Sequence, residues 1–175
     1  VEHVEGGYFS ETYRATEEMP TPREGSSRSV MTSIYYLLTD DRPVDHLHQN
    51  KSDIMHYFQA GAAITYILVD LEGRLSKVKL GMNIAEGEVP QLLVPQGYWK
   101  AAVLETGEYG LLGEAVAPGF AYRDMTIAKA DEIRTQFSNG SIDSVNTYAS
   151  VRCMAFEHAT FIFEGKLISR IRRTR

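Results

Sequence analysis

Apolar and polar residues alternate in short runs along most of the chain, and turn-forming residues separate these runs. Eight runs are rich in β-branched and aromatic residues, the composition typical of strands. They cover residues 8–14, 29–38, 54–58, 62–71, 75–80, 91–94, 98–104 and 109–116. Short strands punctuated by Gly, Pro and Asp at this spacing are typical of a sandwich or a barrel. The pattern therefore predicts an all-β closed sheet.

A helical period occurs only late in the chain. Ile127, Ala130, Ile133, Arg134 and Phe137 recur every three to four residues, and Asn139-Gly140 ends the pattern. This predicts one short C-terminal helix. Residues 141–150 are polar and turn-prone, and residues 151–171 alternate without a clear partner; an added strand, a loose extension and a segment foreign to the barrel all stay open. We expect one domain over residues 1–140 and an extension of uncertain structure over 141–175.

Composition and charge narrow the class of protein. The 175 residues are 43% hydrophobic and 23% charged, as in soluble globular proteins. The net charge of −5 argues against a nucleic-acid partner, and no apolar run approaches the ~20 residues that span a bilayer. Residues 151–175 carry six Lys and Arg against two Glu, which leaves −9 for residues 1–150. One cysteine, Cys153, excludes an intrachain disulfide and favours a reducing, cytoplasmic setting, although no signal names the compartment.

The triplet His46-Leu47-His48 carries the first chemical signal. Two residues apart on a regular strand, His46 and His48 point to the same face and can converge on one target. Asp53 follows five residues after His48, and Gly61 ends the next apolar run.

The spacing His46-x-His48-x4-Asp53-x7-Gly61 resembles the first cupin motif, and Pro95-x-Gly97 resembles the core of the second. Further matches to an uncharacterised branch of the RmlC-like cupins, a "cupin_5"-like domain of unknown function, run in order along the chain. They are Glu5-Gly6-Gly7-Tyr8-Phe9, Ile34-Tyr35-Tyr36-Leu37-Leu38, Val94-Pro95-x-Gly97-x-Trp99 and Val116-Ala117-Pro118-Gly119-Phe120. The resemblance implies a cupin-type double-stranded β-helix, a jelly-roll barrel with a polar pocket at its open end, and a homodimer. It implies no settled activity, because fold does not fix function.

A departure from the cupin pattern bears on the metal. Metal-binding cupins carry a His three residues after the glycine of the second motif, and this chain has Lys100 there. A protonated lysine repels a cation and cannot ligate it. We therefore favour no metal and no other cofactor. The alternative is a divalent transition metal held by His46, His48 and Asp53.

The cupin register turns Lys100 inward, where burial and nearby imidazoles are expected to lower its pKa. Asp53 and His56 alternate along one strand, so only one of them can face the cavity, and Tyr57 accompanies Asp53 as a possible acid. His3, near the terminus, is expected to be solvated. Further candidates for binding a small-molecule substrate are Tyr13, Arg14, Arg28, Tyr36, Asp53 and Trp99.

These residues suggest a metal-independent isomerase, epimerase, dehydratase or cyclase acting on a small polar or carbonyl-bearing molecule. His46 or His48 would serve as acid or base, Tyr57 as an acid, and Lys100 would stabilise developing negative charge. One alternative is a metal-dependent cupin oxygenase or isomerase. Another is a module that binds a small ligand without chemistry. Membrane association is not expected.

Overall fold

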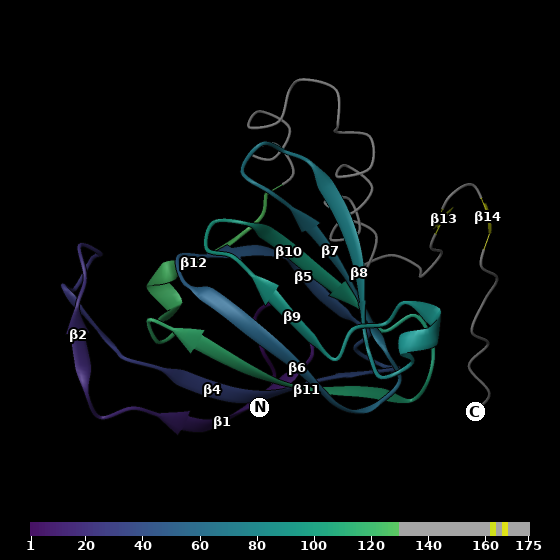
Figure 1. The fold of residues 1–175 in the computed structure, drawn as a ribbon, viewed down its shortest axis with the longest axis horizontal. Coiled ribbons are helices and arrows are strands. Elements are labelled where there is room, and N and C mark those ends of the chain that lie inside the picture. Colours follow the sequence, from purple (N-terminus) through teal and green to yellow (C-terminus); the bar gives the residue numbers. More distant parts are fainter. Residues whose placement is uncertain (130–161, 164–165, 168–175) are drawn as a thin grey trace. The chain divides into compact units, whose positions relative to one another are not determined.

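The computed structural model describes residues 1–129, 162–163 and 166–167. The chain divides into two compact units, Val1–Ala128 and Lys129–Arg175. The first unit contains two five-stranded antiparallel sheets, both visible in Figure 1. In the described part of the chain no helix is long and apolar enough to cross a membrane.

The first sheet has the order β1-β4-β11-β6-β9. Its strands are β1 (Tyr8–Arg14), β4 (Thr32–Thr39), β11 (Tyr109–Ala117), β6 (Asp53–Gly61) and β9 (Gln91–Val94). The second sheet has the order β12-β5-β10-β7-β8. Its strands are β12 (Met125–Ile127), β5 (Val44–Asn50), β10 (Trp99–Val103), β7 (Ile64–Val69) and β8 (Leu75–Leu80).

Smaller elements complete the described residues. The strands β2 (Glu18–Pro20) and β3 (Ser27–Ser29) form a hairpin between β1 and β4. Two short 3-10 helices follow, η1 (Ile84–Glu86) and η2 (Tyr122–Asp124). In the second unit, β13 (Ile162–Phe163) pairs with β14 (Lys166–Leu167).

The hydrophobic core lies between the two large sheets. Leu38 and Leu112 from the first sheet and Ile64 from the second are fully buried in one cluster. Each alternates along its strand with residues of the opposite face, as a two-layer barrel requires. Truncating a buried leucine of this kind to Ala costs about 2–5 kcal/mol, so this core holds the sheets that carry the site.

Register shifts interrupt the alternation in three strand pairs of the large sheets, and two of them determine the inward side chains of β1 and β5. In β1 the register against β4 shifts between Glu11 and Tyr13, and in β5 the register against β10 shifts between the partners of Lys100 and Ala102. A bulge adds one residue to a strand, so residues three apart across it share a face. These shifts decide which side chains of both strands reach the interior.

The predicted all-β fold is confirmed. The predicted helix is not confirmed, since Ile127 ends strand β12 and residues 130–137 lie outside the described residues. Strand β5, which carries His48, was absent from the eight predicted runs, because its polar residues Asp45, His46 and Gln49 hide the strand pattern.

Candidate functional site

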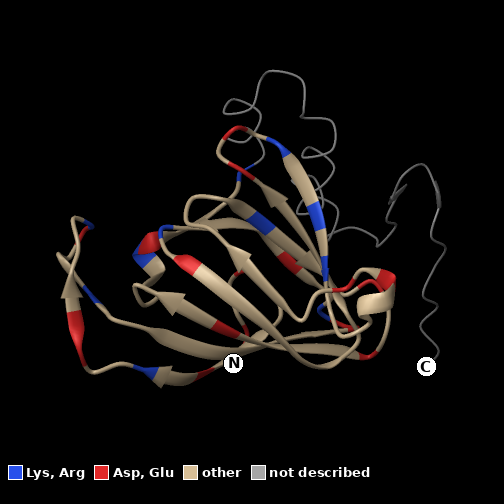
Figure 2. Ribbon diagram, viewed as in Figure 1, with Lys and Arg blue, Asp and Glu red and all other residues tan. Residues whose placement is uncertain are grey.

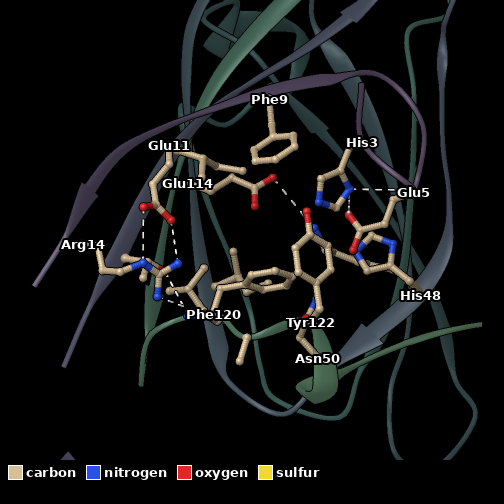
Figure 3. A pocket seen from close by; sticks show the side chains of 16 residues that line it. His3, Glu5, Phe9, Glu11, Arg14, His48, Asn50, Glu114, Phe120 and Tyr122 are labelled. Atoms are coloured by element: carbon tan, nitrogen blue, oxygen red, sulfur yellow. Dashed lines mark hydrogen bonds and ion pairs between the residues drawn. The ribbon is translucent and has the colours of Figure 1, made fainter. Parts of the chain in front are cut away.

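A cavity of about 320 Å³ lies inside the first unit and takes its walls from both sheets. Figure 3 shows its side chains converging from β1, β11, β5 and the segment after β11. The lining residues are His3, Glu5, Phe9, Glu11, Arg14, Thr32, Ile34, His48, Asn50, Ile54, Lys100, Glu114, Val116, Phe120, Ala121 and Tyr122. This volume is at the lower end of the range for small-molecule sites.

The N-terminal segment supplies two of these side chains. Gly6 and Gly7 have φ values of 115° and 58°, and the turn brings the backbone oxygen of Glu5 within 2.6 Å of the His46 amide nitrogen, which donates to it. A side chain at Gly6 would collide with the carbonyl oxygen of Val44, so this tight approach requires glycine. The turn directs Glu5 and His3 into the cavity. His3 is therefore not a solvated terminal residue, as the sequence suggested.

The bulge in β5 changes which residue of this strand shares the inward face with His48. Lys100 pairs with His48, and Ala102 pairs with Asp45, so Asp45 rather than His46 shares the inward face. Both Asp45 and His48 are buried, and their Oδ1 and Nδ1 atoms lie 3.4 Å apart. His46 is not among the lining residues. The expectation that both imidazoles of the triplet converge is wrong, because it assumed an unbroken strand.

The His48 ring has a defined orientation. Its Nδ1 lies 2.7 Å from the backbone oxygen of His46, which can only accept a hydrogen bond, so Nδ1 carries the proton. Its Nε2 lies 3.3 Å from Glu5 Oε1, yet it has no hydrogen-bond partner among the described residues. Nε2 therefore keeps an available lone pair.

Lys100 lines the cavity and is 2% exposed. Its Nζ is 3.1 Å from His56 Nε2 and 3.9 Å from Glu114 Oε1. His56 and Glu114 are direct partners in the register of β6 and β11, so both point inward with Lys100. Of the pair Asp53 and His56, it is His56 that lies inside.

The charges around Lys100 set the protonation of the cavity. Burial lowers the pKa of Lys100, but attraction to Glu114, Asp45 and Glu5 outweighs it, and the pKa rises above its ordinary value. The predicted lowering of the Lys100 pKa is wrong, because the prediction considered the nearby imidazoles and not the buried carboxylates. Burial and the charge of Lys100 lower the pKa of His48 to about 4, against the opposing attraction of Glu5. At neutral pH the cavity thus holds an ammonium ion beside a neutral imidazole.

The three buried carboxylates around Lys100 differ in the direction of their pKa shifts. Burial opposes ionisation of Glu5, but His48, the hydrogen bond with His3 and Lys100 together lower its pKa to about 2. Burial raises the pKa of both Asp45 and Glu114, and the attraction of Lys100 offsets this only in part. Glu5 is therefore the acid that stays ionised over the widest pH range.

Aromatic and aliphatic side chains form much of the remaining wall, together with a few polar residues. The His3 and Phe9 rings meet edge to face with centroids 4.8 Å apart, and Phe120 packs edge to face on Tyr122 at 5.1 Å. Figure 3 shows the Tyr122 ring extending into the cavity. Arg14 also lines the cavity, but its guanidinium binds Glu11 through two nitrogens at 3.2 and 2.6 Å. The bulge in β1 places both of these residues on the inner face.

Several expected site residues lie elsewhere. Tyr57 neighbours His56 on β6 and faces the opposite side of the sheet, and Asp53 is exposed and accepts a hydrogen bond from the Gln96 amide at 2.8 Å. Tyr13 is 53% exposed on the outer side of β1. Tyr36 is buried in the core, where its hydroxyl donates to the Gly6 backbone oxygen at 2.7 Å.

Trp99 and Arg28 are also outside the cavity. Trp99 is buried on the face of β10 opposite Lys100, as strand alternation requires. Arg28 is 4% exposed and binds both carboxylate oxygens of Asp124 at 2.7 Å, which makes it a structural ion pair. The sequence could not separate this arrangement from a ligand-binding arginine.

Three buried residues, Glu5, Asp45 and His48, offer possible metal-ligating atoms within 4.8 Å of one another. This triad differs from the set His46, His48 and Asp53 that the sequence suggested. The His48 ring divides it, because Glu5 lies on the Nε2 side, whereas Asp45 lies on the Nδ1 side, which is hydrogen-bonded to a carbonyl. Lys100 also already supplies a cation to these carboxylates. The donor set therefore fits a single divalent ion poorly.

Two antiparallel sheets that enclose a cavity at the level of the second-motif residue Lys100 define a barrel of the cupin class. The family model described as "Cupin superfamily (DUF985)" matches residues 1–128, and the chain belongs to this family. The resemblance drawn from the sequence is confirmed.

Known relatives support the same assignment. The uncharacterized protein YML079W of Saccharomyces cerevisiae is 39% identical over 145 residues, covering 75% of this chain and 72% of that protein. A solved protein of Shewanella oneidensis is 31% identical with a TM-score of 0.73, covering 85% of this chain and 89% of that one. A hypothetical protein of Leishmania major is 28% identical, also with a TM-score of 0.73, covering 81% and 88%.

A more distant match is an oxalate decarboxylase mutant of Bacillus subtilis, 18% identical with a TM-score of 0.51. It covers 83% of this chain and 36% of the decarboxylase chain, and it supports the fold alone.

Proposed function

We propose that this protein is a metal-independent enzyme that moves a proton beside the carbonyl group of a small molecule, in an isomerisation, epimerisation, dehydration or cyclisation. One observation carries the proposal. Lys100 and His48 line the same cavity and are direct partners across β5 and β10, and the Nε2 of His48 has no hydrogen-bond partner among the described residues. A cation beside a free base is the pair that such a proton transfer needs.

His48 acts as the base. Its Nδ1 proton is held by the His46 carbonyl, so Nε2 can accept a proton from the carbon of the substrate. The imidazolium that forms lies 3.3 Å from Glu5 Oε1, and this ionised carboxylate stabilises it. The low pKa of His48 keeps the base in its active form at neutral pH.

Lys100 stabilises the oxygen on which negative charge develops. Its raised pKa keeps it an ammonium ion, which suits this role and disfavours imine formation, since imine formation needs the neutral amine. His56 accepts a hydrogen bond from it at 3.1 Å and orients it. Tyr122, whose ring extends into the cavity, takes the place proposed for Tyr57 as the acid that returns a proton.

The wall indicates the body of the substrate. Phe9, Ile34 and Phe120 offer apolar surface, and Arg14 is already bound by Glu11. A phosphate or a second carboxylate on the substrate would have to displace Glu11 in order to bind Arg14. The site favours a small carbonyl compound with an aryl or alkyl body.

Solvent exchange tests this proposal without knowledge of the natural reaction. Phenylpyruvate, pyruvate and glucose 6-phosphate are incubated with the protein in D2O, and loss of the C–H signal beside each carbonyl is followed by proton NMR. We expect phenylpyruvate to exchange at least about 100-fold faster than with Lys100→Met protein. Lys77→Met, at an exposed strand position, is the matched control and should keep the wild-type rate. Equal rates for wild type and Lys100→Met would refute the proposal, and tight binding without exchange would favour a binding module.

A further inference from the structure

A second cavity, of about 330 Å³, lies where the end of β5 meets β12 and the turn before β10. Its volume is at the lower end of the range for small-molecule sites. The lining residues are Arg23, Gln49, Asn50, Lys51, Gln96, Gly97, Asp124 and Thr126. Apart from the glycine, all of them have polar or charged side chains, whereas the first cavity has many aromatic and aliphatic residues. Such a lining suits a polar ligand.

Asn50 lines both cavities and is 7% exposed. Its backbone oxygen accepts a hydrogen bond from the Gly97 amide at 2.8 Å, which ties the end of β5 to the turn before β10. Its side-chain Oδ1 is buried and has no hydrogen-bond partner among the described residues. A buried acceptor without a donor costs about 1–3 kcal/mol, so a hydroxyl group of a ligand would relieve this cost.

Arg23 is held in place beside the cavity by three contacts. Its Nη1 donates to Ser52 Oγ at 2.7 Å and to Asp124 Oδ2 at 3.3 Å, and its Nη2 donates to the backbone oxygen of Lys51. Its Nε has no acceptor among the described residues. A guanidinium group that is already fixed loses little freedom when it binds a ligand through the remaining N–H.

The charges around the cavity do not cancel. Arg28 binds both oxygens of Asp124 at 2.7 Å, so this carboxylate is already compensated and the charge of Arg23 is left over. Lys51 also lines the cavity, and its ammonium group has no partner in the described part of the chain. Figure 2 shows both signs of charge at η2 and beside the start of β6. Since residues 1–150 carry −9, a cavity with surplus positive charge favours an anion.

We propose that the second cavity binds an oxyanion group carried by a small hydroxylated molecule, such as a sugar phosphate or a sugar acid. Arg23 and Lys51 bind the oxyanion through charge-assisted hydrogen bonds. The hydroxyl groups are bound by side chains that can donate and accept, namely Gln49, Asn50, Gln96 and Thr126. The Gln96 amide donates to Asp53 at 2.8 Å, which fixes the turn that carries this residue. Of the described residues, only Asn50 lines both cavities, so binding here does not depend on the proton transfer proposed above.

Isothermal titration calorimetry of the full chain with glucose 6-phosphate, gluconate and glucose tests the proposal. At least one of the two anions should bind about 10-fold or more tightly than glucose, and the tighter of the two distinguishes phosphate from carboxylate. Lys51→Met should weaken that binding at least about 10-fold, because a charge-assisted hydrogen bond is lost, whereas Lys51→Arg should keep most of it. Lys77→Met, at an exposed lysine on β8 outside the cavity, is the matched control and should bind as the wild type does.

A second variant and a second measurement locate the ligand. Thr126→Val, at an exposed position of β12, removes one hydroxyl and should weaken binding about 3-fold or more. In amide NMR spectra the backbone signal of Gly97 and the side-chain signals of Gln49 and Gln96 should shift when the anion is added. Anions that bind no more tightly than glucose, binding that Lys51→Met leaves unchanged, or shifts confined to the first cavity would overturn the proposal.

Discussion

The Nε2 of His56 lies 3.1 Å from the Nζ of Lys100, and the Nδ1 of His56 faces the backbone oxygen of Leu92 at 3.3 Å. Since the carbonyl can only accept, Nδ1 carries the ring proton and Nε2 must accept from the ammonium group. Burial, followed by the charge of Lys100, lowers the pKa of His56 well below its ordinary value, so the ring stays neutral. The neutral ring of His56 therefore accepts a hydrogen bond from Lys100 without placing a second positive charge beside it.

The first prediction concerns the pH dependence of the proposed exchange. Only neutral His48 can accept a proton, so the rate should rise with pH through about 4 and then level off. Lys100, whose pKa is raised, should cause no alkaline loss below the ordinary lysine value of 10.5. Exchange rates measured by NMR, with circular dichroism at each pH, check this. Glu5→Gln removes an attraction that raises the pKa of His48, so its acid limb should move to lower pH; an unchanged limb would contradict the assignment of the base.

The second prediction separates the two tyrosines. Tyr122→Phe should slow exchange about 10-fold to 100-fold, because a hydroxyl that extends into the cavity is lost. Tyr57→Phe should leave the rate unchanged, since Tyr57 does not line the cavity. The deuterium uptake of phenylpyruvate measures both. The reverse order of effects would show that the acid comes from elsewhere.

The third prediction is that Arg28 stabilises the fold and does not bind the substrate. Arg28→Met leaves Asp124 with only its longer contact to Arg23, 3.3 Å away, and should lower Tm by roughly 5 °C or more. Arg74→Met, which breaks an exposed pair with Asp70, should change Tm little. Thermal unfolding followed by circular dichroism compares them. Folded Arg28→Met protein should keep its exchange rate. A selective loss of phenylpyruvate binding would show instead that Arg28 belongs to the substrate site.

The fourth prediction concerns the turn that carries Glu5. Gly6→Ala forces a side chain against the Val44 carbonyl at positive φ and should cost about 2–4 kcal/mol in the free energy of unfolding. Gly87 also has positive φ, 79°, but has open space around it, so Gly87→Ala should cost only about 1 kcal/mol. Urea unfolding measures the difference. Equal costs would mean that the close approach to β5 does not constrain the turn.

The fifth prediction concerns metal. Because the His48 ring separates Glu5 from Asp45, protein purified without chelators should hold far less than one transition metal ion per chain by elemental analysis. Treatment with EDTA should not change the exchange rate. Stoichiometric metal, with activity lost on chelation and restored by the ion, would favour the metal-dependent alternative.

The sequence predicted the barrel well because its signal is local. Runs such as 75–80 and 91–94 coincide with β8 and β9, where turn residues mark each end. It also placed Lys100 in the cavity, because the second cupin motif fixes the register of β10.

The site was harder to predict, since it depends on contacts between distant segments. Glu5 and His3 reach the cavity only through the turn at Gly6-Gly7, which no periodicity reveals. Glu114 and His56 did leave a signal. Each lies among apolar residues on one face of its strand, Glu114 between Leu112 and Val116, and a polar residue in that setting marks a buried interaction.

The bulge in β5 has a consequence for how this chain tolerates change in length. Deleting one residue at position 46 or 47 would remove the extra residue of the bulge, and Asp45 would then stand two residues before His48 on a regular strand and still face inward. If the strand instead kept its length and lost the bulge, Asp45 would turn outward without any substitution at that position. The bulge itself therefore sets the place of one carboxylate beside Lys100, and the strand can lose one residue there without reversing the side chains that precede it.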